Sequence, residues 1–335
     1  MESLQTCQSE RVMWLDSAKA IGVVLVVLGH FLYGTSFGGG INRAIYSFHM
    51  PMFFIAAGFV SRGKTKNLSW LKKRFFRVLL PALIWEVLIE TSLAIVLHNE
   101  INWSSAIYLY GRLIYNDPIW FFICLFCIEI LILITDQIKS STNWVYLLEI
   151  CIALIVGFLL YINVNIPDYF GFKKVIIAFA FYRIGEMLNA LEIFKSKKQV
   201  VVMGICSSIL WFVFGVVLNG KVSFYGMELG NYLFFIASGL FGSVMMFAIC
   251  HFIPSTKWSR FLCDNSVVIV ATHYPLVSVF GAIMGKIGAS GIIYYDLILI
   301  PFLVIVLVAY RYVVCPIINK YLPILNGKKT ILEKV

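Results

Sequence analysis

Two ionisable side chains, Lys19 and His30, lie eleven residues apart in the first long apolar stretch of the chain. At about 100° per residue, this spacing places them roughly 20° apart around a helix and about 16 Å apart along it. The two side chains would therefore share one helix face at different depths. Because an ionisable group inside a membrane is costly, such residues are functional-site candidates by default. The spacing suggests a path across a bilayer rather than a contacting pair.

A second histidine, His49, follows in the next apolar stretch. The short connection makes the two helices antiparallel neighbours, so both imidazoles would lie within roughly 12 Å of one membrane surface and can face one cavity. An imidazole that titrates near neutral pH can take the proton of a hydroxyl group as its oxygen attacks, which is general-base catalysis. The alternative for each histidine is a hydrogen bond that packs two helices together.

A carboxylate that orients the first histidine would have to come from another span. Asp16 lies on nearly the same helix face, but the helical rise places it about 21 Å from His30. Each carboxylate on another span has the alternative of pairing with a cation inside the membrane, such as Arg183. The candidates are Glu86, Glu90 and Glu129.

A basic cluster precedes the third apolar stretch, in the run Lys72-Lys-Arg74-Phe-Phe-Arg77. Arg74 and Arg77 are three residues apart, which makes them neighbours on one face of an α-helix. Their forked guanidinium groups suit phosphate. A phosphorylated donor that enters from the cytoplasm would meet these side chains and Lys19. The alternative is simple anchoring of the chain at the inner membrane surface.

Four side chains on later spans are candidates for lining a cavity that receives an acceptor. An aromatic ring such as that of Trp120 can stack on a sugar, although membrane interfaces are rich in Trp for other reasons. Arg183 and Glu186 are one turn apart and form either a structural salt bridge or part of a cavity wall. Pro275 can kink its helix around a cavity. The four candidates are Trp120, Arg183, Asn265 and His273.

The composition predicts the setting of these residues. Of the 335 residues, 61% are hydrophobic and only 13% are charged. This hydrophobic fraction exceeds what a soluble core of this size requires. Apolar runs long enough to cross a bilayer of about 30 Å recur along the whole chain. We therefore expect an all-α integral membrane protein with about ten transmembrane helices. They are placed near residues 20–37, 44–61, 78–97, 119–138, 144–162, 174–190, 200–218, 232–253, 266–285 and 294–311.

The basic residues predict the orientation of the chain. Seven Lys and Arg residues fall between Arg62 and Arg77, and together with the other inner segments they place both termini in the cytoplasm. Topology and contact with anionic lipids then account for most of the net charge of +10, so we expect no nucleic-acid partner. The eight scattered cysteines predict no metal site. We expect a single integral-membrane domain over residues 1–335, without a soluble extracytoplasmic domain.

Five motifs in order give the chain a resemblance to the acyltransferase-3 family of integral-membrane O-acyltransferases, with the fucose 4-O-acetylase-like branch as the nearest. The motifs cover nearly the whole chain, and each is loose alone. They are Val-Leu-Gly-His30 with a basic residue at position 19, Ser-Phe-His49-Met-Pro-Met-Phe-Phe with Gly58, Arg74-x-x-Arg77 before Pro81, Pro118-Ile-Trp120-Phe-Phe with Leu125-Phe126, and Asn265-Ser266 followed by His273-x-Pro275.

The resemblance implies membrane-embedded O-acetyl transfer from cytoplasmic acetyl-CoA, a co-substrate rather than a bound cofactor, to a hydroxyl group of a cell-surface polysaccharide or its lipid-linked precursor. It implies that His30 is the catalytic histidine and that Lys19, Arg74 and Arg77 contact the acyl donor. Many relatives have Arg where this chain has Lys19, and Lys lacks the bidentate fork. The protein would be a multi-pass component of the cell membrane, either the bacterial inner membrane or a plasma membrane.

Two other classes of function fit the same residues. A transporter of a polar or anionic small molecule would use them to line a route, although no internal repeat or matching pair of broken spans supports this alternative. A membrane scaffold or sensor without catalysis would tolerate the loss of His30. The enzyme hypothesis predicts that this loss abolishes activity without preventing membrane insertion.

Overall fold

The computed structural model describes residues 12–32, 38–96, 119–136, 143–166, 168, 171–286 and 292–328. Within these ranges the chain is helical and contains no strand beyond a single β-bridge between Ser223 and Glu228. An all-α fold, as expected from the sequence, is therefore what the structure shows. The motif residue Pro118 and the side chain of Glu90 lie outside the described residues.

The helices fall into a first group up to residue 136 and a second group from residue 143. The first group is α1 (Met13–Phe31), α2 (Gly38–Tyr46), α3 (His49–Ser61), α4 (Leu68–Arg74), η1 (Phe75–Leu79), α5 (Leu80–Val96) and α7 (Trp120–Asp136). The second group is α8 (Asn143–Ile162), α9 (Phe172–Ala190), α10 (Lys197–Trp211), η4 (Phe212–Leu218), α11 (Tyr232–His251), α12 (Lys257–Asp264), α13 (Ser266–Lys286), α14 (Ile292–Ala309), η5 (Tyr310–Val314), α15 (Cys315–Tyr321) and η6 (Pro323–Asn326).

Each of the ten predicted spans overlaps helix within the described residues, although the span predicted at 44–61 is divided between α2 and α3. Seven segments of the described chain are long and apolar enough to cross a bilayer. The other three predicted spans correspond to α5 and α7, of 17 residues each, and to α9, which carries four charged side chains. A count of ten crossings therefore stays a prediction, as does the cytoplasmic position of both termini.

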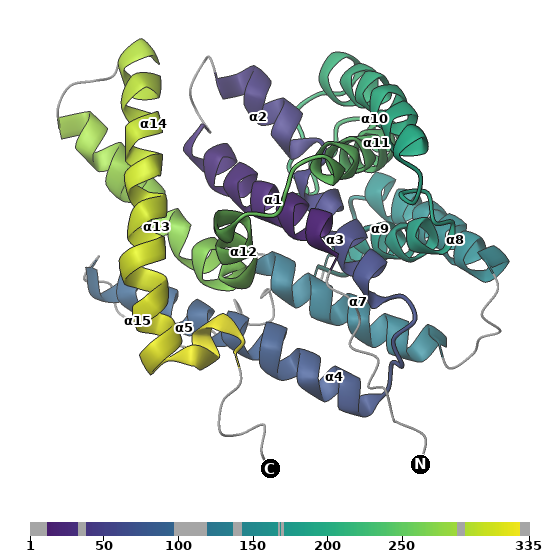
Figure 1. Cartoon of the computed structure of the whole chain (residues 1–335), viewed down its shortest axis with the longest axis horizontal. Coiled ribbons are helices and arrows are strands. Elements are labelled where there is room, and N and C mark those ends of the chain that lie inside the picture. The colour runs from purple at the N-terminus through teal and green to yellow at the C-terminus, as the bar shows by residue number, and fades with distance from the viewer. Residues whose placement is uncertain are drawn as a thin grey trace.

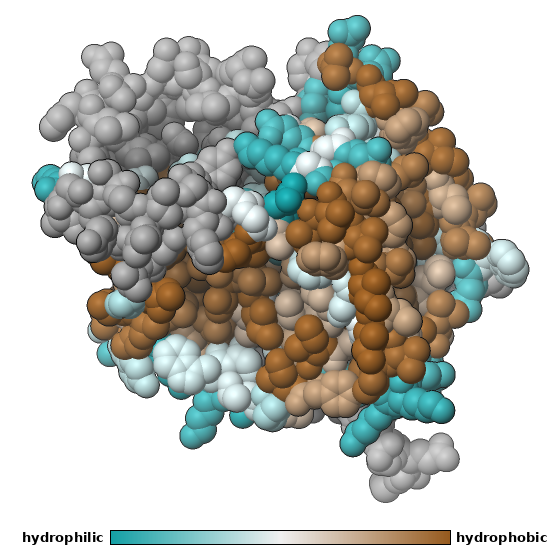
Figure 2. Space-filling model, turned by 90° about the horizontal axis from the view of Figure 1, so that it is seen from above, coloured by the Kyte–Doolittle hydropathy of each residue, from teal (hydrophilic) through white to brown (hydrophobic). Residues whose placement is uncertain are grey.

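The outer faces of the helix bundle are apolar. On α8 and α10, large hydrophobic side chains such as Ile155, Leu159 and Ile209 are more than half exposed. Figure 2 shows broad hydrophobic areas between more hydrophilic groups at opposite edges of the molecule. A helix face of this kind is stable when it contacts lipid rather than water.

Helix α1 lies at the centre of the bundle, with α13 and α14 on one side and α8 and α9 on the other (Figure 1). It begins at Met13, earlier than the predicted start at residue 20, because apolar residues such as Leu15 already pack inside the bundle. Asn42 of α2 donates a side-chain hydrogen bond to the carbonyl of Gly29 at 2.8 Å. This bond fixes the backbone immediately before His30.

Helices α3 and α9 cross at backbone contact. A Cβ atom on Gly58 would lie 1.9 Å from the carbonyl oxygen of Tyr182, and one on Gly185 would lie 2.0 Å from that of Ile55. Only glycine therefore fits at either position. The crossing places the start of α3, which carries His49, and Tyr182 of α9 around one interior space.

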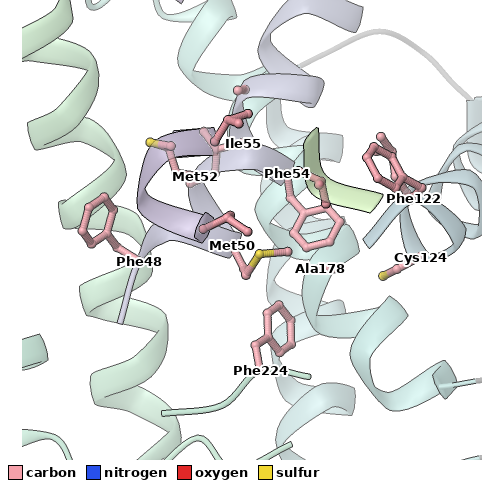
Figure 3. Packing of buried hydrophobic residues seen from close by; sticks show 14 of the residues in the cluster. Phe48, Met50, Met52, Phe54, Ile55, Phe122, Cys124, Ala178 and Phe224 are labelled. Atoms are coloured by element: carbon pink, nitrogen blue, oxygen red, sulfur yellow. The ribbon is translucent and has the colours of Figure 1, made fainter. Parts of the chain in front are cut away.

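The segment between η4 and α11 folds into the bundle. The Asn219 side chain accepts hydrogen bonds from the backbone of Gly220 and Asn231, at 3.0 and 2.9 Å, and so ties the two ends of the segment together. Phe224 in its middle is buried, with its ring centre 5.6 Å from that of Trp120. Figure 3 shows Phe224 in the same packed region as Phe54 of α3.

Candidate functional site

A cavity of about 600 Å³ runs through the interior of the bundle. We call one end, lined by Lys19, Lys64 and Arg74, the basic end, and the other, lined by His30 and His49, the histidine end. The shared helix face predicted for Lys19 and His30 is confirmed, because both side chains line this cavity. It therefore joins a concentration of positive charge to two imidazoles.

The wall between the two ends is mostly apolar and aromatic. Further lining residues include Tyr46, Trp70, Trp120, Glu129, Tyr182, Ser223, Phe224, Tyr225 and Tyr274. They come from α2, α4, α7, α9, the segment between η4 and α11, and α13. A cavity lined in this way can exclude water while a few polar groups orient a substrate.

Arg74 at the basic end is held by Glu129 of α7. Its Nε donates to Oε1 of Glu129 at 2.6 Å, and its Nη2 lies 2.6 Å from the same oxygen. Burial opposes the charge on the guanidinium, but the neighbouring carboxylate outweighs this effect and raises the pKa of Arg74. Arg74 is therefore a fixed cation at the cavity wall.

Glu129 was one of three candidates to orient His30, with pairing to a cation as the alternative. The structure shows a cation pair, with Arg74 at the basic end as the partner instead of Arg183. Glu129 is nine residues beyond Trp120, about 14 Å along α7. The buried carboxylate of Glu86, another candidate, is not among the groups that line the cavity.

Lys64 is a basic residue of the cavity that the sequence analysis did not single out. It lies between α3 and α4, and burial lowers its pKa, with further lowering from the charges of Arg74 and Lys19. Three cations thus repel one another at one end of a cavity, and an anion bound there would relieve the repulsion. Such an arrangement favours phosphate or pyrophosphate.

The side chain of Arg77 does not lie at the basic end of the cavity. This side chain is exposed and does not line the cavity, although it is only three residues from Arg74. The prediction of a shared face assumed α-helical geometry, whereas Phe75–Leu79 form a turn of π-helix. In this wider turn, residues three apart point in more divergent directions. The prediction that Arg74 and Arg77 share one helix face was therefore wrong.

Aromatic rings surround His30 at the histidine end. Its ring centre lies 6.2 Å from that of Tyr46 and 5.7 Å from that of Tyr274. The Nδ1 atom of His49 is 2.9 Å from the carbonyl oxygen of Ile45, so Nδ1 carries a proton and donates it to that oxygen. Neutral His49 therefore has its lone pair on Nε2.

Trp120 lines the cavity, as predicted, but it is only 3% exposed. Its ring packs against Phe54 and Phe224, with ring centres 6.2 and 5.6 Å apart. Ser223 and Tyr225, on either side of Phe224, also line the cavity. This part of the wall was not predicted, because a connecting segment with no periodic pattern gives no sign that it folds inward.

Arg183 lies in a separate buried cluster. It pairs with Glu186 one turn away, as one of the two sequence interpretations proposed, and also with Asp136 at 2.9 Å and Glu149 at 2.7 Å. Lys66 joins the cluster through Glu186 and Asp136. Arg183 does not line the cavity, so the other interpretation, a place in the cavity wall, was wrong. Three carboxylates hold its charge within the bundle.

Asn265 is the centre of an asparagine cluster. Its Oδ1 accepts hydrogen bonds from Nδ2 of Asn319 and Nδ2 of Asn326, each at 2.8 Å. Asn326 also donates to Oδ1 of Asn319 at 2.8 Å. The cluster holds α15 and η6 against the junction of α12 and α13. The expectation that Asn265 lines the cavity was therefore wrong, although its neighbour Ser266 does.

His273 was also predicted to line the cavity and does not. It is fully buried on α13, with its ring centre 5.0 Å from that of His30. The side chain that follows it, Tyr274, lines the cavity instead. Within the described part of the chain, no group of His, Cys, Asp and Glu side chains is arranged to hold a metal ion.

Comparison with known proteins gives the class of the chain. The acyltransferase-3 family, whose members share an acyltransferase domain, matches residues 12–317. Two curated relatives, both named nodulation protein NolL, are 34% identical over 94 residues in Sinorhizobium fredii and 33% identical over 93 residues in Mesorhizobium japonicum. Each match covers 25% of this chain and about a quarter of the relative, 26% and 25% respectively. No solved structure matches the chain. None of these matches supports the transporter hypothesis.

Proposed function

Because the chain belongs to the acyltransferase-3 family, we propose that it is an O-acetyltransferase of the cell membrane that uses cytoplasmic acetyl-CoA. The acceptor is a hydroxyl group of a cell-surface polysaccharide or of its lipid-linked precursor. The family supports a membrane acyltransferase, and the apolar outer faces of the helices support a multi-pass protein. The donor, the acceptor and the membrane in which the protein lies are parts of the proposal.

The cavity is the observation that carries this proposal. It holds Lys19, Lys64 and Arg74 at one end and His30 at the other. Lys19 and His30 are eleven residues apart on α1, or about 16 Å by the helical rise. An extended thioester donor with its phosphates at the basic end could place its acyl group near the imidazoles. This arrangement fits basic residues that bind the phosphates, a histidine that acts as the base, and a donor molecule that extends from one to the other.

The chemistry at the histidine end follows from the two substrates. His30 takes the proton of the acceptor hydroxyl as its oxygen attacks the thioester carbonyl. A C–O bond forms, the C–S bond breaks, and the proton passes to the departing thiolate of coenzyme A. In a second version, His30 attacks first: a C–N bond forms, the C–S bond breaks, and the thiolate of coenzyme A takes the proton of the other ring nitrogen. The acceptor oxygen then forms its C–O bond as the C–N bond breaks, and the acceptor proton passes to the imidazole. In either version the rate depends on His30.

Reconstitution into liposomes tests the proposal directly. Purified protein is given labelled acetyl-CoA outside and a candidate glycan inside, and the reverse, and the label on the glycan is measured. His30→Gln should abolish transfer, whereas His251→Gln should leave it intact. His251 is a matched control because it lies at the end of α11, outside the cavity lining.

Two outcomes would overturn the proposal. One is that label never leaves coenzyme A with any glycan, while an anionic solute crosses the bilayer. The other is that His30→Gln transfers as fast as the wild type. Acetyl analysis of the surface polysaccharide of cells with and without the protein identifies the acceptor independently.

A further inference from the structure

His273 is a buried polar residue that the proposed reaction does not yet use. It is 0% exposed on α13, and its ring lies 5.0 Å from that of His30, with an angle of 55° between the ring planes. His30 faces the cavity, whereas His273 lies outside the lining. His30 therefore lies at the cavity surface, and His273 lies behind it, farther from the cavity.

The hydrogen bond at one ring nitrogen of His273 sets the role of the other. Nδ1 lies 2.8 Å from the carbonyl oxygen of Val270, which can only accept a hydrogen bond. Nδ1 therefore carries the proton, and Nε2 of the neutral ring is an acceptor. Among the described residues, this buried Nε2 atom has no hydrogen-bond partner. A buried acceptor without a donor is costly and is uncommon unless it has a use.

The separation of the two rings suits a direct hydrogen bond. A ring nitrogen lies about 1.2 Å from the centre of an imidazole, so two rings joined by an N–H···N bond of about 2.9 Å have centres roughly 5 Å apart. The separation of His30 and His273 already has this value. The remaining requirement for the bond is that a nitrogen of one ring faces a nitrogen of the other.

We propose that His273 is a positioning residue for His30. Its Nε2 accepts a hydrogen bond from one ring nitrogen of His30 when the substrates are bound, which keeps the proton on that nitrogen. The lone pair of His30 then lies on its other ring nitrogen, toward the proton of the acceptor hydroxyl. The inference rests on the proposed function, and it adds a second layer to the same site. A neutral imidazole that accepts in this way orients a base without touching the substrate.

Two substitutions of His273 separate this role from packing. Glutamine places its side-chain oxygen near the position of Nε2, whereas asparagine reaches only the position of Nδ1. His273→Asn can therefore keep the bond to Val270 but cannot reach His30. Transfer by wild type, His30→Ala and both His273 variants is measured in liposomes, with kcat and KM for acetyl-CoA determined separately.

The expected result is a fall in kcat of about 100-fold for His273→Asn, which is typical of a misoriented catalytic group. The KM for acetyl-CoA should stay within about twofold of the wild type, because the basic end is unchanged. His273→Gln should retain most of kcat. A double variant, His30→Ala with His273→Asn, should be no slower than His30→Ala alone.

Each contrary result points to a different failure. If His30→Ala is inactive but His273→Asn transfers at the wild-type rate, or if Gln and Asn reduce kcat equally, the inference fails and the proposed function stands. If His30→Ala is as active as the wild type, the proposed function itself fails, and the inference with it.

Chemical rescue covers the case in which the asparagine variant does not fold. His273→Ala leaves a space for a five-membered ring, and added imidazole should restore part of kcat. Pyrrole has the same shape and can donate to Val270, but it has no acceptor nitrogen and should not restore activity. Equal rescue by the two compounds would show that His273 only fills space and would overturn the inference.

Discussion

Two nitrogen atoms of Arg74 contact the same carboxylate oxygen of Glu129, because Nε and Nη2 of Arg74 both lie 2.6 Å from Oε1 of Glu129. The two residues are 55 positions apart and join α4 to α7 at the basic end of the cavity. This contact fixes the guanidinium while its Nη1 atom remains outside the pair. If the basic end binds the donor, as proposed, we expect its binding to depend on Glu129 even without contact between Glu129 and the donor.

Glu129→Gln should weaken donor binding. The amide oxygen still accepts from Arg74, but the charge is lost, and a charge-assisted bond is about twice as strong as a neutral one. We expect the KM for acetyl-CoA to rise about tenfold, equivalent to about 1.4 kcal/mol, with kcat little changed. Steady-state kinetics with varied acetyl-CoA measure both constants. A fall in kcat at constant KM would instead place Glu129 at the histidine end.

The two arginines of the Arg74-x-x-Arg77 motif should differ in effect. Arg74→Ala removes a cation from the cavity wall and leaves the buried Glu129 without its partner, so donor binding should fall by about 100-fold or more. Arg77→Ala removes an exposed side chain outside the lining and should weaken donor binding by less than threefold. Binding of coenzyme A to the detergent-solubilised protein compares them, and equal losses would contradict the position assigned to Arg77.

Donor binding should also depend on pH through Lys64. Burial and the nearby charges of Arg74 and Lys19 lower the pKa of Lys64. Its charged form attracts phosphate, so KM for acetyl-CoA should rise as pH increases through this lowered pKa. Lys64→Arg keeps its charge at high pH and should remove the rise, while Lys64→Met should have a raised KM throughout. The exposed Lys73→Met serves as the control, and an unchanged pH profile in Lys64→Arg would exclude Lys64.

Phe224 should affect the acceptor and not the donor. Its ring packs on Trp120 and holds the inward-folded segment at the cavity wall. Phe224→Ala should raise KM for the glycan about tenfold or more, while hydrolysis of acetyl-CoA by water stays near the wild-type rate. The control is Phe252→Ala, because Phe252 is 53% exposed at the end of α11. A parallel loss of both reactions would show that Phe224 only supports the fold.

Asn265 should matter for stability rather than for binding. Asn265→Ala leaves the amides of Asn319 and Asn326 without their shared acceptor. A buried unsatisfied group costs about 1–3 kcal/mol, so the thermal midpoint in detergent should fall. The protein that remains folded should keep its KM for both substrates. A changed KM for the glycan with normal stability would restore Asn265 to the cavity.

Helical periodicity predicted which residues share one face of an α-helix. The spacing of Lys19 and His30 places both on one face of α1, and both line the cavity. The same reasoning was wrong at Arg77, where five residues adopt a π-helical turn that composition does not reveal. Long apolar runs likewise predicted the positions of the helices well, because a membrane requires both length and hydrophobicity.

Periodicity cannot tell which neighbour a polar side chain faces. Asn265, Arg183 and His273 all lie at interior positions, but only the packing of separate helices decides between the cavity, an ion cluster and a second layer behind His30. The positions of Lys64 and of the inward-folded segment around Phe224 at the cavity could not be predicted for the same reason. Their roles depend on contacts between residues far apart in the chain.

The glycine crossing of α3 and α9 has a mechanical consequence. With Gly58 and Gly185 in backbone contact, these two helices cannot slide past each other without a collision of main-chain atoms. They form a rigid wall that any opening of the cavity must leave in place. Under the proposed function, entry of the acceptor would require movement elsewhere. Helix α13 at the histidine end contains Pro275, and a proline removes one backbone hydrogen-bond donor from a helix and can kink it.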